Sequence, residues 1–190
     1  INRGGEVVQI DKEPIVFTIE DPEFWIEKME DKDLLLMNPK EIEEFNQENF
    51  SKLDFLIDLE DHEGSIKKEN LNELIKDTSM MPKELRYDRL GNIMDENYFN
   101  SIIQNFHLES FPDSIPVKYG VATNRTMIRT FPTYEPSYRE KGEAHFDRFM
   151  ETAIYPWEPL IIYSESADGE WYFGRMYNYL GWIPKKDVAI

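Results

Sequence analysis

The final 80 residues carry the feature that most limits the possible folds. They consist of short apolar runs separated by turn residues, and they hold 16 of the chain's 26 aromatic side chains. The dipeptide Asp168-Gly169 is a hairpin signal, because glycine adopts positive φ at little cost. Many short strands joined by turns favour a small antiparallel barrel. We expect strands at about 119–122, 126–130, 159–164, 170–177, 180–183 and 188–190.

The preceding part of the chain has a different composition. Residues 1–110 hold 27 acidic and 12 basic side chains, whereas residues 111–190 hold 11 and 9. Such a shift indicates two structural regimes. We therefore expect a mainly β chain with a helical N-terminal region, an α+β arrangement in which residues 1–110 are helical and loop-rich and residues 111–190 form the barrel.

Capping residues and apolar spacing predict the helices of the first part. Asn38-Pro39-Lys40-Glu41 has the residues of a helix start, with Asn38 as the cap and Glu41 three positions later. Apolar residues at helical spacing predict two further helices, over 67–76 and 95–105. The opening stretch, residues 1–32, has no strong period, and we expect an extended arm with one helical turn near Pro22.

Composition argues against several classes of function. The formal net charge is −17, whereas nucleic-acid binding depends largely on Lys and Arg, and anionic membrane surfaces also attract basic segments. No apolar run approaches the length of about 18 residues that a membrane-spanning helix needs. The chain has no cysteine, so it contains no disulfide, thiolate metal site or cysteine nucleophile.

No pattern in the sequence predicts a metal or cofactor site. His62, His107 and His145 are far apart and form no metal-binding motif, so we expect them to have structural roles. The acidic residues from Asp58 to Glu63 resemble a calcium loop, but Glu63 stands where that loop requires glycine. We expect a solvated acidic loop, because runs of charge usually face water.

An ordered set of motifs resembles a bacterial SH3 (SH3b) domain. Asp168-Gly169-Glu170-Trp171 and Gly181-Trp182-Ile183-Pro184 have the hairpin glycine, the covering tryptophan and the strand-ending proline of such a barrel. Together with Arg129-Thr130-Phe131-Pro132-Thr133 and Phe146-Asp147-Arg148-Phe149, they are similar to the first SH3b domain of NlpC/P60-family cell-wall peptidases. The resemblance extends over about residues 38–190, because the helical region is similar to a segment that precedes this domain in one branch of the family.

The resemblance implies an SH3-like small barrel that serves as a non-catalytic targeting or architectural module of a secreted peptidoglycan endopeptidase. Members of the family cut the stem peptide beside γ-D-glutamate with a cysteine and a histidine in a separate papain-like domain. The implied partners are the stem peptide or glycan and that catalytic domain, and the implied location is extracytoplasmic, at the cell envelope or secreted. Because the chain begins with Ile1, we also expect a signal peptide or another stretch to precede it.

A long insertion, at about 131–158, interrupts the predicted strands. Within it, residues 146–152 are predicted to form a short helix with Phe146, Phe149 and Met150 on one face. In such a helix Arg148 could pair with Asp147 beside it or with Glu151 at i+3. In that case the ion pair would close the insertion, and the insertion would have a structural role alone.

The resemblance adds a functional alternative for the same insertion, which would border the substrate cleft. Arg148 or Arg129 would then bind a carboxylate of the stem peptide in bidentate fashion, and Asp147 a free amine. The aromatic residues leave a similar choice open. We expect Trp171 and Trp182 in the core, whereas core and recognition surface are equally open for Trp157 and Tyr179.

Two other functions stay open. The chain could be a stand-alone SH3-like module that binds cell wall or protein, although it lacks the acidic and tyrosine-rich pattern of SH3 domains that bind polyproline. It could also be an autonomous enzyme, such as a glycosidase, that uses two carboxylates about 5–10 Å apart. Sequence spacing alone does not establish such a pair.

Overall fold

The computed structural model describes residues 18–190, and these divide into two compact units with a boundary after Phe45. The first unit contains the helix α1 (Pro22–Ile26) and the beginning of α2 (Pro39–Lys52). The predicted helical turn near Pro22 is therefore confirmed. Most of the extended arm expected over residues 1–32 lies outside the described residues. Among residues 18–190, no helix is both long and apolar enough to cross a membrane.

The start of α2 has the predicted capping geometry. The Asn38 side-chain oxygen accepts hydrogen bonds from the backbone N–H groups of Lys40 at 2.9 Å and Glu41 at 3.1 Å. The Glu41 carboxylate in turn accepts from the Asn38 N–H at 2.7 Å. These reciprocal bonds satisfy N–H groups that have no partner within the helix, which is why the chain becomes helical here.

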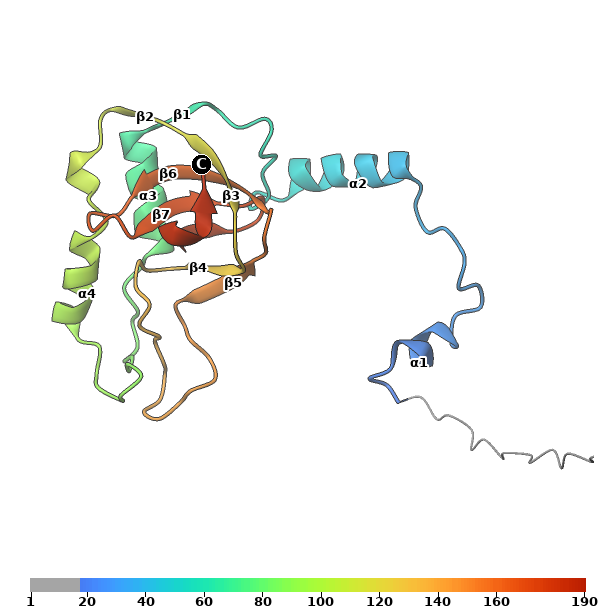
Figure 1. Ribbon diagram of the computed structural model, residues 1–190, viewed down its shortest axis with the longest axis horizontal. Helices are drawn as coiled ribbons and strands as arrows, with labels where there is room; N and C mark the ends of the chain where they lie inside the picture. Colours follow the sequence, from blue (N-terminus) through green and yellow to red (C-terminus); the bar gives the residue numbers. More distant parts are fainter. Residues whose placement is uncertain (1–17) are drawn as a thin grey trace, which may run out of the picture. The chain divides into compact units, whose positions relative to one another are not determined.

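The second unit is built on a sheet of seven antiparallel strands in the order β5-β4-β8-β7-β6-β3-β9 (Figure 1). The strands are β3 (Lys118–Ala122), β4 (Thr126–Arg129), β5 (Met150–Ile154), β6 (Pro159–Glu165), β7 (Trp171–Arg175), β8 (Leu180–Pro184) and β9 (Val188–Ala189). The six strands predicted from the sequence are all present. The hairpin between β6 and β7 contains Gly169 with φ of +73°, as the Asp-Gly signal predicts.

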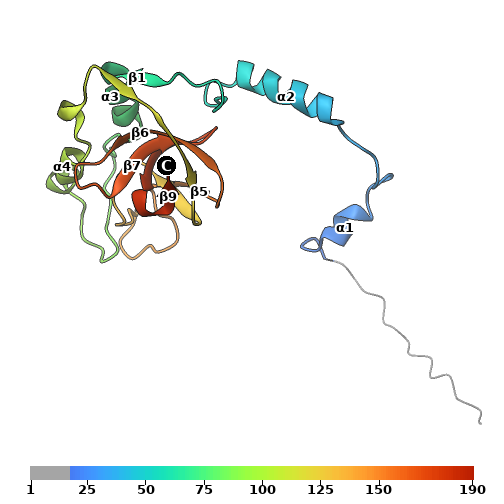
Figure 2. The ribbon, with the colours of Figure 1, turned by 45° about the horizontal axis from the view of Figure 1, so that its top comes forward.

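The sheet curls round on itself, as Figure 2 shows. The hydrogen-bonded pairs run from β5 to β9, and within the described chain no pairing joins these two end strands. The result is a small SH3-like sheet in a mainly β chain with helices, which confirms the predicted fold class, although hydrogen bonds do not close the barrel all the way round. The 3₁₀ turn η2 (Lys185–Asp187) separates β8 from β9.

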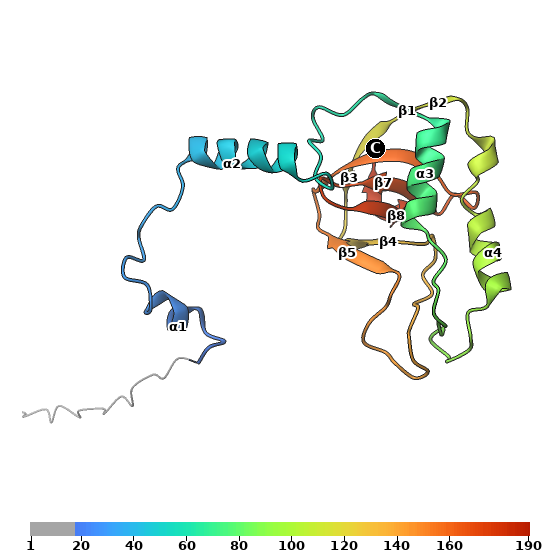
Figure 3. The same ribbon diagram turned by 180° about the vertical axis from the view of Figure 1, so that it is seen from behind.

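Two helices and a short second sheet cover one face of the seven-stranded sheet. These are α3 (Lys68–Thr78) and α4 (Glu96–Gln104), with the pair β1 (Ser65–Lys67) and β2 (Ser114–Pro116) beside them (Figure 3). The 3₁₀ turn η1 (Leu108–Ser110) follows α4. Both helices begin within a residue or two of the predicted positions. The Asp95 side chain caps α4 by accepting from the Tyr98 N–H at 2.9 Å.

The helices and the sheet share one hydrophobic core. Leu71 and Ile75 of α3 and Phe99 of α4 pack in the same buried cluster as Phe173 and Trp182 of the sheet. A second cluster fills the opposite face of the sheet with Leu160, Ile162, Tyr172 and Ile183, among others. Side chains alternate along β7, with Trp171 and Phe173 in the first cluster and Tyr172 in the second.

Trp182 connects the end of α3 to the centre of the sheet. Its ring is fully buried and stacks on Phe106 at a centroid distance of 5.4 Å. Its indole N–H donates to the Ser79 hydroxyl at 3.1 Å, and that hydroxyl donates to the Thr130 carbonyl at 2.5 Å. A buried indole N–H needs such a partner, so Ser79 fixes how the helix meets the sheet. Trp171 is equally buried, and the prediction that both are core residues is confirmed.

The predicted helix over residues 146–152 is wrong. Residues Met150–Ile154 form β5, which pairs with β4 in antiparallel register. The three side chains assigned to one helical face have separate environments, because Phe149 is buried, whereas Phe146 is 65% and Met150 43% exposed. Pairing with β4 and burial of Phe149 between Phe99 and Phe131 outweigh the local helical pattern.

Candidate functional site

An ion pair between a buried arginine and a partly exposed aspartate fixes the insertion that the sequence singles out. Arg129, at the end of β4, is 3% exposed and donates to a carboxylate oxygen of Asp147 at 2.7 Å. The other Asp147 oxygen accepts from the N–H groups of Ser137 and Phe149, both at 3.0 Å. Arg129 also donates to the Glu135 carbonyl at 3.0 Å. Asp147 therefore ties Ser137, in the middle of the loop, and Phe149, at its end, to Arg129 on the sheet, and it supplies the countercharge of Arg129.

This loop, residues 131–149, is joined along its length to a second long loop, residues 79–95. Tyr87 and Tyr138 exchange two backbone hydrogen bonds of 2.9 Å. The Arg89 guanidinium contacts both carboxylate oxygens of Glu135, with the shortest distance at 2.7 Å, and the hydrogen bond to Glu135 raises the pKa of Arg89. The two loops extend together beyond the edge of the sheet in Figure 1, and their cross-links give them a defined shape.

A groove of about 660 Å³ lies where these loops meet the sheet. Its lining comes from the end of α3 and the segment that follows it, from the start of the insertion, and from residues 148–151 and 179–180. Phe131 and Phe149 contribute buried rings, whereas Met80 and Met81 are 70% and 43% exposed. We call it the arginine groove, because Arg86 and Arg148 both line it.

Three of the six candidate residues meet in the arginine groove: Arg148, Glu151 and Tyr179. Arg148 does not pair with Asp147 or Glu151, the two predicted partners. Its guanidinium instead lies 3.6 Å from Glu143 and 5.5 Å from the centre of the Phe146 ring. Glu151 and Tyr179 are exposed. Arg129 and Asp147 do not line the groove and act as its buried support.

Trp157 lies apart from the arginine groove, in the turn between β5 and β6. Its side chain is 82% exposed and its φ is +73°, a left-handed conformation that is rare for a bulky residue. Its N–H donates to the Ala122 carbonyl at 2.8 Å. The neighbouring Tyr155 is 57% exposed, with the Arg125 guanidinium 5.6 Å from its ring centre. The structure therefore presents Trp157 to solvent rather than to the core.

Sequence reasoning missed two basic residues of the arginine groove, Lys83 and Arg86. Arg86 has 12% of its side chain exposed, and its Nη1 lies 3.3 Å from the Glu84 carboxylate and 3.1 Å from the Leu85 carbonyl. No local sequence motif surrounds either residue. Both lie shortly before Tyr87, whose bridge is a tertiary contact that the sequence does not reveal.

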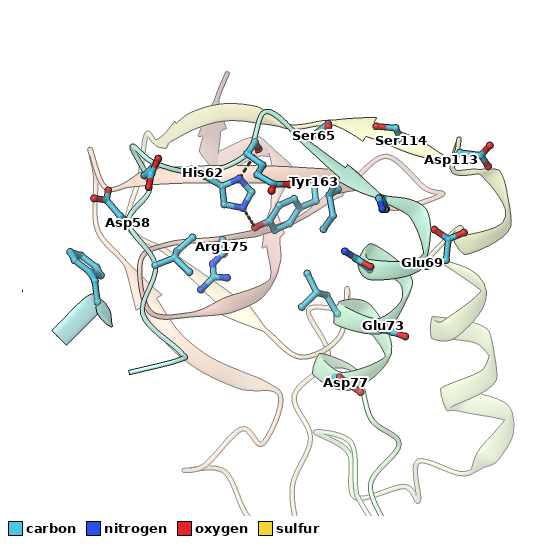
Figure 4. A pocket seen from close by; sticks show the side chains of 18 residues that line it. Asp58, His62, Ser65, Glu69, Glu73, Asp77, Asp113, Ser114, Tyr163 and Arg175 are labelled. Carbon is cyan, nitrogen blue, oxygen red and sulfur yellow. Dashed lines mark hydrogen bonds between the residues drawn. The ribbon is translucent and has the colours of Figure 1, made fainter. Parts of the chain in front are cut away.

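A second groove, of about 1240 Å³, has the opposite charge, and we call it the acidic groove. Glu69, Glu73 and Asp77 follow one another at four-residue intervals along α3 and line it, as Figure 4 shows. Asp58 and Asp61, from the loop predicted to be acidic and solvated, are exposed at its other side. In residues 18–190 no cluster of His, Asp and Glu has the arrangement of a metal site.

His62 joins the acidic loop to the sheet at the inner end of the acidic groove. Its Nε2 is 2.9 Å from the Tyr163 hydroxyl and its Nδ1 is 2.8 Å from the Glu63 carbonyl (Figure 4). Tyr163 is 3% exposed, and this burial raises the pKa of its hydroxyl. His62 therefore holds the loop in place.

Comparisons with known proteins bear on the fold of the sheet. Residues 132–184 match the family model of the SH3 domain of the SH3b1 type, so the predicted SH3b domain is confirmed. Among curated proteins, none matches the chain. A solved structure described as a novel NlpC/P60 endopeptidase from Photobacterium damselae subsp. piscicida is similar with a TM-score of 0.60 and 23% identity.

That similarity covers 80% of this chain and 37% of the endopeptidase chain. At this level of identity it shows a shared fold. It covers more of the chain than the 53 residues of the SH3b1 segment, and it corresponds to about a third of the length of the endopeptidase chain.

Proposed function

We propose that this chain is a non-catalytic module of a cell-envelope or secreted peptidoglycan endopeptidase. In this role it holds a papain-like cysteine peptidase domain in position and borders the cleft that receives the stem peptide. The observation that carries the proposal is the shared fold with an NlpC/P60 endopeptidase over 80% of the chain. The absence of cysteine from all 190 residues supports a role without a nucleophile of its own.

The arginine groove supports the second part of the proposal. It gathers three candidate residues beside two cross-linked loops, and the ion pair Arg129–Asp147 holds one of these loops to the sheet. Sites that bind a substrate work best when rigid elements support the contacting side chains. The exposed Trp157 offers a separate aromatic surface for a glycan or for a neighbouring domain.

Sedimentation with insoluble peptidoglycan tests the association with the wall. The chain is expected to sediment with peptidoglycan and to stay in solution with chitin, which has a related glycan but no stem peptides. A chain that stays in solution with both polymers contradicts direct wall binding. Equal sedimentation with both assigns binding to the glycan and argues against contact with the stem peptide.

A hydrolysis assay tests the absence of catalysis. The chain incubated with soluble peptidoglycan fragments is expected to release no new amino groups above a buffer blank. Hydrolysis that persists through every purification step would show an autonomous enzyme.

A substitution in the arginine groove tests the contact with the substrate cleft. In a peptidase that joins this chain to its catalytic domain, Arg148→Ala is expected to lower kcat/KM without a change in unfolding temperature. Unchanged kinetics would remove the cleft from the proposal.

A further inference from the structure

The two ring nitrogens of His62 have different hydrogen-bonding roles. Nδ1 lies 2.8 Å from the Glu63 carbonyl oxygen, and a carbonyl only accepts, so Nδ1 carries a hydrogen and donates it. In the neutral ring, Nε2 then has a free lone pair. The Tyr163 hydroxyl, 2.9 Å from Nε2, donates to it (Figure 4). The contact between loop and sheet therefore depends on the neutral form of His62.

Tyr163 supplies a hydrogen that has to find an acceptor. Burial is the largest influence on this hydroxyl and raises its pKa, while Arg175 acts in the opposite direction, so the phenol keeps its hydrogen at neutral pH. The side chain is 3% exposed, which leaves little access for water. Among residues 18–190, the structure gives this hydroxyl His62 as its acceptor.

A proton on His62 reverses the direction of this hydrogen bond. Nε2 becomes a donor, and the Tyr163 hydrogen loses its acceptor in a buried position, which costs free energy. Arg175 cannot replace the acceptor, because a guanidinium only donates. Arg175 also lines the acidic groove beside His62, so an imidazolium in the present position faces a second cation.

The other charged groups do not hold the imidazolium in this position. Asp58, Asp61 and Glu63 belong to the acidic loop itself, so they attract the imidazolium wherever the loop moves. From β3, the neutral Tyr119 hydroxyl reaches only the backbone carbonyl of His62, at 3.4 Å. The remaining charged residues that line the groove are four acids and one base from β1, α3 and the turn before β2: Lys67, Glu69, Glu73, Asp77 and Asp113. Their net negative charge attracts an imidazolium across the groove and away from the sheet.

The acidic loop is fixed at both ends but lightly held in between. The Ile57 N–H donates to the Tyr177 carbonyl at 2.8 Å, and the Gly64 carbonyl accepts from the Val117 N–H at 3.1 Å. Leu59 packs against the core. Beyond Leu59, the acids at positions 60, 61 and 63 are exposed, and the hydrogen bond from Tyr163 to His62 joins this stretch to the sheet. Loss of that bond would therefore free residues 60–63 while the rest of the loop stays attached.

We propose that His62 is a pH-sensitive latch of the acidic groove. In its neutral form it holds residues 60–63 against the sheet, and when it takes up a proton it releases them and opens the inner end of the groove. Histidine is the side chain whose charge ordinarily changes between about pH 5 and pH 8, so the latch responds within this range. The latch needs no ligand and does not depend on the proposed role at the cell wall.

The test follows proton uptake and loop release in the same chain between about pH 8 and about pH 5. NMR signals of the His62 imidazole report the proton. Because the chain has no cysteine, Glu60→Cys gives a single attachment site for a nitroxide, whose electron paramagnetic resonance spectrum separates held from released loop. The ratio of released to held loop is expected to rise about tenfold at the lower pH, the effect of losing about one buried hydrogen bond, with the midpoint of the imidazole titration.

Three variants in the labelled chain identify the group responsible. His62→Gln keeps an acceptor for Tyr163 but has no proton to take up, so the loop is expected to stay held at both pH values. Tyr163→Phe removes the hydroxyl, so the loop is expected to be released at both. His145→Gln changes an exposed histidine outside the acidic groove and is expected to keep the full response. A thermal melt confirms that each variant is folded.

A nitroxide spectrum that does not change while the His62 imidazole titrates overturns the inference. An imidazole that stays neutral down to about pH 5 overturns it as well. A full response in His62→Gln would assign the change to the carboxylates of the groove and would also contradict the latch. Should Tyr163→Phe fail to fold, the parent chain and His62→Gln decide between these outcomes.

Discussion

The conformation of Trp157 has a cost that its contacts do not offset. A side chain with a Cβ in the left-handed region costs about 1–2 kcal/mol, and at 82% exposure Trp157 gains little from packing. Trp157→Gly is therefore expected to raise the free energy of unfolding by about 0.5–1 kcal/mol, the strain relieved less the added entropy of the unfolded glycine. Urea denaturation measures the change.

Trp157→Ala is the matched control for this prediction. It removes the indole but keeps the Cβ, so no gain in stability is expected. A loss of stability in Trp157→Gly would show that the ring has a structural role. A gain in stability combined with weaker sedimentation with peptidoglycan would support wall contact through Trp157.

Substitution of Asp147 is expected to change the free energy of unfolding more than substitution of Trp157 does. Asp147→Asn leaves the Arg129 guanidinium, which is 3% exposed, without a countercharge, and breaking a buried pair in this way costs about 3 kcal/mol. The exposed pair Lys40–Glu44 on α2 offers a control, where Glu44→Gln is expected to cost less than about 0.5 kcal/mol. Similar small losses in both variants, measured by urea denaturation, would contradict a supporting role for Asp147.

At the scale of elements, β4 and β8 approach closely at Gly181. A Cβ at this position would lie 2.5 Å from the Arg129 carbonyl oxygen and 2.6 Å from the Ile128 Cγ2. Gly181→Ala is therefore expected to force the two strands apart and to lower the free energy of unfolding by about 2–3 kcal/mol. Because Arg129 is one of the affected residues, binding at the arginine groove is expected to weaken as well.

Gly64→Ala provides the comparison, since a Cβ at Gly64 would have no other atom within 4 Å. Its effect on the free energy of unfolding is expected to be below about 0.5 kcal/mol. Thermal and urea unfolding of both variants measures the difference. Equal stability of the two variants would mean that the strands can separate at no cost.

Local signals predict most elements of this fold. The cap at Asn38, the apolar spacing of α3 and α4 and the turn at Gly169 are all properties of a few neighbouring residues, and each is found where the sequence places it. The short strands β1 and β2 were not predicted, because Ser65–Lys67 has only three residues and pairs with a segment almost 50 positions later.

The candidate site was harder to predict than the fold. Arg148, Glu151 and Tyr179 were selected from the sequence and do share a groove. The pairing of Asp147 with Arg129 instead of Arg148 depends on how the insertion folds back to the sheet. Arg86 precedes Tyr87, which pairs with Tyr138 of the insertion. Such long-range contacts leave no local pattern.

At the scale of the whole molecule, the main feature is the net negative charge. A net charge of −17 makes the folded state repel itself, and salt screens this repulsion. Raising NaCl from about 10 mM to about 150 mM shortens the screening length from about 30 Å to about 8 Å, so the unfolding temperature is expected to rise. The same series near pH 4.5, the sequence pI, is expected to show a weaker rise, and equal slopes would contradict this account.

Asp77, in the last turn of α3, lines both the acidic groove and the arginine groove. The charged side chains therefore change, on either side of one helix end, from mainly acidic in the acidic groove to mainly basic in the arginine groove. A flexible molecule that carries an ammonium at one tip and a carboxylate at the other would have a single favourable direction along this stretch. The two grooves together would therefore fix the orientation of an extended ligand, which neither groove alone does.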